Sequence, residues 1–189
     1  MKKIAIIVVI TQLLACGSEV SKEYQKLVET VDHKVKNIDH NHRIQIIEDD
    51  FVRADSLYKV RGYFSQGRLL KLVGIIKTSH FERDDYFYFE NNKPIFSGHM
   101  INFMDDQLAE EFKYYYSPKT HQIEECLFWE DHYEPGKRFP HETFEEFSPD
   151  MDSLMNEEES RMQFYLSHLD EEGFEIKRIN ENLEANSTR

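Results

Sequence analysis

A short hairpin pattern occurs three times in the middle of this chain and limits the folds available to it. The three copies span residues 63–70, 88–95 and 115–123. Each copy begins with an aromatic pair, continues through a polar turn and ends in a return strand, and successive copies begin about 25 residues apart. Two strands joined by a short polar turn form a β-hairpin. The repetition therefore predicts one antiparallel sheet over residues 58–129.

Alternation of polar and apolar residues divides this stretch into strands. We expect strands at 57–64, 69–78, 86–89, 95–103, 108–116 and 123–129, with a first short strand between 43 and 50. The turns at 65–67, 91–92 and 105–106 are short and rich in residues that favour tight turns, so successive strands should be neighbours. The alternation also places Phe112, Tyr114 and Tyr116 on an apolar face, with Tyr115 on the other face.

Apolar residues recur at helical spacing on both sides of this region. The first stripe, over residues 18–37, contains Val20, Tyr24, Leu27, Val28, Val31 and Val35, and Ile38 continues it. A second helix should start at Ser148-Pro149-Asp150 and end at Gly173, followed by an edge strand around residues 174–179. The predicted fold class is α+β: an antiparallel β-meander of about six strands flanked by N-terminal and C-terminal amphipathic helices. The first helix can cover the sheet or pair with a helix of another molecule.

Chain length limits the number of domains, and net charge limits the kinds of partner. A chain of 189 residues suits one domain, which we expect over residues 16–180, followed by a polar tail at 181–189. The formal net charge is -13, and removal of Lys2 and Lys3 with a signal peptide would make it -15. Such a charge argues against binding to nucleic acid, and against attraction to anionic lipid by charge alone.

The N-terminus has the order of parts that a signal peptide requires. Lys2 and Lys3 precede an apolar run over residues 4–14, which is too short for a permanent membrane span. The end of the run, Leu13-Leu14-Ala15-Cys16, resembles the lipobox of bacterial lipoproteins. The resemblance implies that residues 1–15 are removed and that the Cys16 thiol carries a diacylglycerol. The alternative is an ordinary secretory signal with an unmodified Cys16.

A lipid on Cys16 would set the location of the protein. Two or more acyl chains suffice for stable membrane anchoring, so the expected partner is a membrane and the expected location is the cell envelope. In the sorting scheme of enteric lipoproteins, aspartate after the cysteine acts as an inner-membrane retention signal. Gly17 occupies that position here, so the resemblance implies the outer membrane. Cys126 is then the only other cysteine, so no intramolecular disulfide is possible, and its strand-like surroundings predict a buried, inert thiol.

The hairpin unit at residues 63–70, Tyr-Phe-x-x-Gly-Arg-x-Leu, resembles the units of MORN-variant repeat proteins. Similar sequence segments occur in uncharacterised lipoproteins of Bacteroidota, which this chain also resembles in that respect. The resemblance implies a binding or scaffold role. The second copy departs from the unit with Asn92 in place of glycine, and the third has a longer turn. Unrelated aromatic meanders also produce this pattern.

Candidate binding residues lie at the end of the sheet and in the loop at 130–147, because long loops in compact domains are often functional. They are Tyr115, Phe128, His132, Tyr133, His141 and Glu142. The loop lacks the second histidine of the His-Glu-x-x-His zinc signature, so we expect no metal and no other cofactor. No catalytic signature was found, and no catalytic residue is assigned.

These features predict a lipid-anchored, non-enzymatic envelope protein that binds another protein or a glycan. The alternative is a small envelope hydrolase that uses the histidines and carboxylates of the 130–147 loop.

Overall fold

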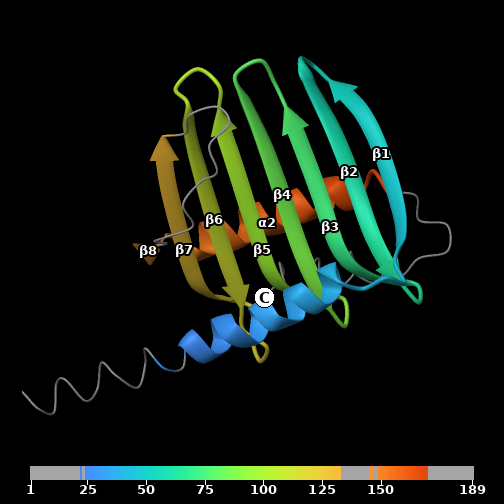
Figure 1. Cartoon of the computed structure of the whole chain (residues 1–189), viewed down its shortest axis with the longest axis vertical. Helices are drawn as coiled ribbons and strands as arrows, with labels where there is room; N and C mark the ends of the chain where they lie inside the picture. The colour runs from blue at the N-terminus through green and yellow to red at the C-terminus, as the bar shows by residue number, and fades with distance from the viewer. Residues whose placement is uncertain (1–21, 23, 133–144, 147–148, 170–189) are drawn as a thin grey trace, which may run out of the picture.

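The computed structural model describes residues 22, 24–132, 145–146 and 149–169. Its centre is one antiparallel sheet in which every strand pairs with the next strand along the chain (Figure 1). The strands are β1 (Gln45–Arg53), β2 (Ser56–Ser65), β3 (Arg68–Lys77), β4 (Phe81–Glu90), β5 (Lys93–Phe103), β6 (Leu108–Tyr116), β7 (Ile123–His132) and the two-residue β8 (Glu145–Glu146). A first helix at 24–39 precedes the sheet, and α2 (Met151–Leu166) follows it.

The predicted antiparallel meander with two helices is confirmed, but the predicted count of about six strands is wrong. The sheet has seven long strands, because β1 pairs with β2 along its whole length. The acidic residues of β1 do not interrupt it, since they form ion pairs across the strands: Glu48 with Arg61 at 3.0 Å and Asp50 with Lys59 at 3.3 Å. Charged side chains also lie inside β4, which begins at Phe81 rather than at residue 86.

The three hairpin copies share one structural irregularity. The strand register shifts within the aromatic pair of each copy, between Tyr63 and Phe64, between Tyr88 and Phe89, and between Tyr115 and Tyr116. An extra residue in one strand changes the direction in which nearby side chains point. Phe64 and Phe89 belong to the apolar cluster under α2, whereas Tyr88 belongs to the cluster under the first helix. The aromatic pair of the unit therefore contributes side chains to the apolar clusters on both faces of the sheet.

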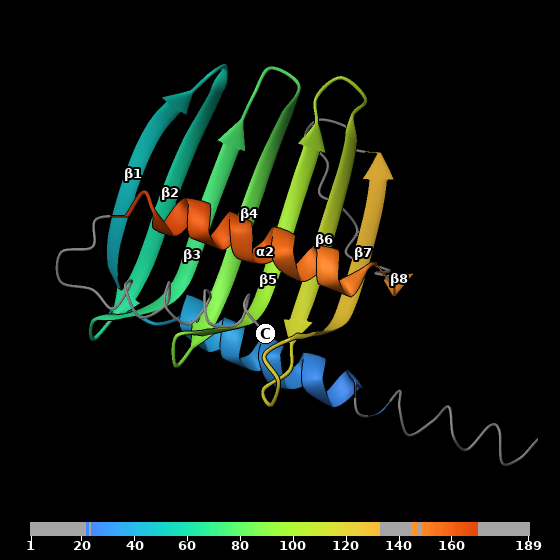
Figure 2. The ribbon, with the colours of Figure 1, turned by 180° about the vertical axis from the view of Figure 1, so that it is seen from behind.

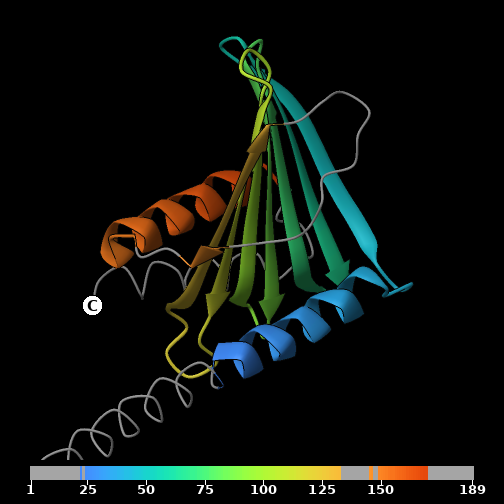
Figure 3. The same cartoon turned by 60° about the vertical axis from the view of Figure 1, so that its left-hand side comes forward.

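The two helices lie against opposite faces of the sheet (Figures 2 and 3). Under α2, Phe87 and Leu72 pack with Met162, Tyr165 and Leu166 of the helix. Burying one large apolar side chain contributes about 1.5–3 kcal/mol, so this contact stabilises the fold substantially. The side chain of Asp150 caps α2 by accepting hydrogen bonds from the amides of its first turn.

The first helix contacts the other face through apolar and polar side chains. Val31 is 4% exposed and packs in a cluster with Tyr88 and Tyr115. The hydroxyl of Tyr88 donates to Asp39 at 2.9 Å, and the hydroxyl of Tyr115 donates to Asp32 at 3.1 Å. Because these aspartates lie seven residues apart, they share one side of the helix. The described part of this helix is therefore fixed to the sheet at two points.

The second helix ends earlier than predicted. α2 stops at Leu166 rather than near Gly173, and the Ser167 hydroxyl donates to the carbonyl of Phe164 at its end. The predicted edge strand at 174–179 lies outside the described residues.

Candidate functional site

Three charged side chains meet between the centre of the sheet and α2. Asp85 of β4, His99 of β5 and Glu158 of α2 are each at most 1% exposed. Nδ1 of His99 lies 2.6 Å from Oδ1 of Asp85, and Nε2 of His99 lies 3.0 Å from Oε2 of Glu158. An ionised carboxylate only accepts hydrogen bonds, so each ring nitrogen must carry a hydrogen. The geometry therefore holds His99 as an imidazolium between two carboxylates.

Strand register and a glycine create this arrangement. Asp85 is the cross-strand partner of both Gly74 on β3 and His99 on β5. Gly74 leaves room for the ring of Tyr165, because a Cβ at this position would lie 2.2 Å from Cζ of that ring. The Tyr165 hydroxyl donates to Oδ2 of Asp85. A side chain at position 74 would therefore displace the helix residue that completes the hydrogen bonding of Asp85.

The pKa values of the three groups follow from burial opposed by close charges. Burial favours the neutral form of Asp85, but the hydrogen bond to His99 and the charges of His99 and Arg83 lower its pKa to about 2. Burial also disfavours ionised Glu158, yet the adjacent His99 lowers the pKa of this carboxyl. Burial acts to lower the pKa of His99, and the Glu158 charge together with the two hydrogen bonds raises it. These shifts favour the charged form of each of the three groups.

Two arginines extend the cluster. Nε of Arg83 lies 2.6 Å from Oδ1 of Asp85, and Nη1 of Arg161 lies 2.5 Å from Oε1 of Glu158. Nε of Arg161 is also 3.9 Å from Oδ2 of Asp85, so both guanidinium groups converge on this carboxylate. With His99 protonated, three cations face two carboxylates, and the cluster has a formal charge of +1.

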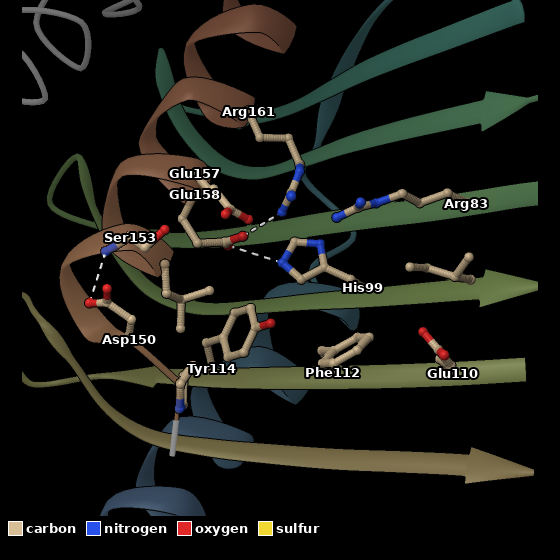
Figure 4. Close-up of a pocket in the computed structure, with 13 residues that line it drawn as sticks. Arg83, His99, Glu110, Phe112, Tyr114, Asp150, Ser153, Glu157, Glu158 and Arg161 are labelled. Atoms are coloured by element: carbon tan, nitrogen blue, oxygen red, sulfur yellow. Dashed lines mark hydrogen bonds and ion pairs between the residues drawn. The ribbon is translucent and has the colours of Figure 1, made fainter. Parts of the chain in front are cut away.

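A cavity of about 370 Å³ opens beside this cluster (Figure 4). His99, Arg83 and Arg161 lie on one side of it, and Phe112 and Tyr114 form an aromatic wall. The remaining lining residues include the carboxylates Glu110, Asp150 and Glu157. Burial and the nearby charge of Glu130 raise the pKa of Glu110. The cavity therefore has cationic groups at the sheet centre and acidic groups around its other walls.

This arrangement suits binding better than proton transfer. Both nitrogens of His99 point at carboxylates, so neither has a lone pair available to act as a general base. Ser97 donates its hydroxyl hydrogen to Glu158 at 2.7 Å and is not directed at the cavity by that bond. Burial and the Asp85 charge raise the pKa of Tyr165, which stays a neutral donor. In the part of the chain that the structure describes, no three His, Cys, Asp or Glu side chains are grouped to hold a metal ion.

The structure does not bring the predicted binding residues together. Tyr115 is 2% exposed beneath the first helix. Phe128 lies on the α2 face, where its ring centroid is 4.9 Å from that of Phe112. His132 ends β7, and its side chain is outside the described set, as are Tyr133, His141, Glu142 and Cys16.

Cys126 matches its predicted environment. Its side chain belongs to a buried cluster with Tyr114 and Tyr116, and the thiol is free. Burial raises the pKa of this thiol to about 11. A thiol with such a pKa carries almost no thiolate at neutral pH and is a poor nucleophile.

Sequence reasoning missed the central cluster. One available signal was Glu158, which lies four residues after Leu154 and four before Met162, and therefore on the apolar stripe of α2. A charged residue at a core position needs a buried partner. Asp85 gave a similar signal, because it shares a face of β4 with Phe87 and Phe89.

Comparisons with protein-family models, with curated proteins and with solved structures found no match for this chain. Within the described helices, none is long and apolar enough to cross a membrane.

Proposed function

We propose that this protein is a lipid-anchored component of the cell envelope that binds a small anionic ligand in the cavity between α2 and the sheet. The observation that carries the binding part is the convergence of Arg83 and Arg161 on one side of that cavity. The anchoring part rests on the lipobox at residues 13–16 and on Cys16 as the lipidated residue.

The two guanidinium groups retain unused donors. Arg83 uses Nε for Asp85, and its Nη atoms have no hydrogen-bond partner among the described residues. Arg161 uses Nη1 for Glu158. The planar guanidinium group binds carboxylate and phosphate in a bidentate manner. Because the cluster carries a net positive charge when His99 is protonated, an anionic group beside it would be stabilised.

The acidic walls favour a ligand that also carries a cation. Glu110 and Glu130 repel each other, and that repulsion contributes to the raised pKa of Glu110. An ammonium group near Glu110, Asp150 or Glu157 would relieve it. An amino acid or a short peptide has both charges, and its size suits a cavity at the lower end of the usual range for ligand sites, about 300–1,000 Å³.

Thermal unfolding of the protein with a panel of amino acids and dipeptides tests the proposed ligand class. Each compound that raises the melting temperature is then compared by calorimetry with its amide, which lacks the carboxylate, and its N-acetyl form, which lacks the ammonium. We expect the amide to bind at least tenfold more weakly. Arg83→Gln should abolish binding, and the exposed Arg68→Gln should not affect it. If no compound stabilises the protein, or the amides bind equally, the proposed ligand class is wrong.

The anchor is tested separately. Cells supplied with a fatty-acid analogue should yield labelled protein in the envelope fraction, and Cys16→Ala should remove both the label and the location. Labelled, envelope-bound Cys16→Ala protein would contradict the assignment. The predicted protein or glycan partner would bind at the aromatic sheet face or at the 130–147 loop, and the hydrolase alternative uses that loop. No contact between described residues favours either.

A further inference from the structure

The first helix and the residues flanking it carry a row of exposed side chains on the side away from the sheet. The row is Lys22, Lys26, Glu29, His33, Lys36 and His40, all exposed and spaced three or four residues apart. Such spacing places them on one side of the helix, opposite Val31 and the other residues that contact the sheet. Three lysines stand against one glutamate, so this cationic row has a formal charge of +2 with both histidines neutral.

The adjacent end of the sheet is also basic. Arg68, Lys93 and Lys119 lie in or directly after the turns at this end, beneath which the first helix runs (Figure 1). Lys119 and Lys26 line one hollow, and Arg68 and Lys34 line another, which confirms that helix and turns adjoin.

Two carboxylates near the first helix are paired with lysines, and a third, the exposed Glu124, lies in the same hollow as Lys26 and Lys119. Lys34 binds Glu90 at 2.6 Å, and Lys71 binds Asp39 at 2.7 Å. The turns at the far end, at 54–55, 78–80 and 104–107, contain Asp55, Asp105 and Asp106. Arg53 and Lys77 directly precede two of these turns, so three acidic side chains stand against two basic ones there. The two ends of the molecule therefore have opposite local charge.

We propose that the cationic row lies on an anionic bilayer surface and orients the protein with the acidic end away from the membrane. The orientation of the anchored protein rests on the proposed lipid at Cys16, whereas the affinity of the row for anionic lipid does not. Five residues lie between Cys16 and Lys22, and a chain of this length spans at most about 20 Å. The row would thus be held near the headgroups.

For contacts between the cationic row and lipid headgroups, the charge of the row outweighs the net charge of -13 on the whole chain. Interactions between exposed charges are screened beyond about 10 Å at 0.1 M salt, so the acidic end hardly affects contacts made by the row. The expectation that charge disfavours anionic lipid thus holds for the chain as a whole but not for this surface. The cavity is lined by α2, which lies on the face of the sheet opposite the first helix (Figure 3). In this orientation the cavity would face away from the bilayer surface.

Sedimentation with vesicles tests the inference without the lipid. The chain from residue 16 carrying Cys16→Ser is mixed with phosphatidylcholine vesicles that contain or lack phosphatidylglycerol, at low and at high salt. We expect binding only to the anionic vesicles and only at low salt. A lysine near an anionic surface contributes about fivefold, equivalent to about 1 kcal/mol. Lys26→Glu with Lys36→Glu should therefore reduce partitioning by about 30-fold or more.

The matched control changes the same charge elsewhere. Lys59→Glu with Lys77→Glu alters two lysines on the sheet, with side chains 37% and 56% exposed, and should reduce partitioning far less. Equal losses in the two double variants would reject the cationic row as the contact surface, as would equal binding to both vesicle types or no binding at low salt. An unlabelled Cys16 in cells together with intact vesicle binding would reject the anchor and leave this surface standing.

Discussion

Asp85 and His99 face each other across β4 and β5, with 2.6 Å between Oδ1 and Nδ1. Glu158 on α2 contacts the other nitrogen of the same ring. A single imidazolium thus links two strands to the helix that packs on them. Because each carboxylate also contacts an arginine, removal of any member leaves a buried charge with too few partners.

Glu158→Ala should destabilise the fold strongly. Breaking a buried ion pair by removing one partner costs about 3–5 kcal/mol, because the remaining charge stays buried. The neighbouring Glu157 is exposed, so Glu157→Ala should change the free energy of unfolding by no more than about 0.5 kcal/mol. Urea denaturation of both variants measures the contrast, and similar values for the two would contradict the proposed role of the network.

The network also predicts how stability depends on pH. The pKa of His99 is raised, so its charge stabilises the fold fully below the ordinary value of 6.5, and this contribution is lost as pH rises through the raised value. The pKa of Asp85 is lowered to about 2, so its contribution is complete above 3.8 and is lost as pH falls toward 2.

Two measurements check this dependence. The difference in free energy of unfolding between the natural protein and His99→Gln should shrink as pH rises above 6.5. NMR of the His99 ring in the natural protein should show both nitrogens protonated at neutral pH. A neutral ring under these conditions would show that the assignment is incorrect.

Gly74→Ala should displace Tyr165 from its place above β3. The added Cβ would lie 2.2 Å from Cζ of the ring, and such overpacking costs about 1–3 kcal/mol. The same substitution should cost much less in a Tyr165→Leu background, where no ring occupies the space. A double-mutant cycle measures this coupling. Strictly additive effects would mean that Tyr165 does not require the glycine.

Tyr88→Phe should loosen the first helix. The lost hydroxyl donates to the carboxylate of Asp39, and a hydrogen bond to a charged group contributes about 1.5–3 kcal/mol. The Tyr63 hydroxyl has no hydrogen-bond partner within the described ranges, so Tyr63→Phe is the control and should change little. Hydrogen exchange of residues 24–39 reports the effect, and equal protection in the two variants would argue against this attachment.

Cys126 should resist thiol reagents in the folded protein. It is 5% exposed and its pKa is about 11, so both access and thiolate are lacking. With Cys16→Ser, the only remaining thiol should react at least a hundredfold faster in denaturant than in buffer. Rapid labelling of the native chain would mean that this part of the sheet opens readily.

Local patterns predicted the hairpins because an aromatic pair, a polar turn and a return strand lie within a few residues of each other. The same reasoning underestimated the lengths of β1 and β4, which contain several acidic residues. Those residues are stabilised by partners from other strands, such as Arg61 for Glu48 and His99 for Asp85, and such pairing depends on the register of the sheet.

The candidate site divides in the same way. The predicted residues Tyr115 and Phe128 lie on the adjacent strands β6 and β7, but side-chain alternation and register put them on opposite faces. Helical spacing alone places the residues of the cationic row on one side of the helix. Only the packing of the opposite side against the sheet shows that this row faces away from the sheet.

The sequence by itself determined the antiparallel meander and the presence of two helices, because alternation, helical spacing and turn chemistry act over short distances along the chain. Only the tertiary structure decided that Asp85, His99 and Glu158 meet. These residues are 14 and 59 positions apart, and their charges are tolerated in the interior only when the folded chain supplies each with its partners.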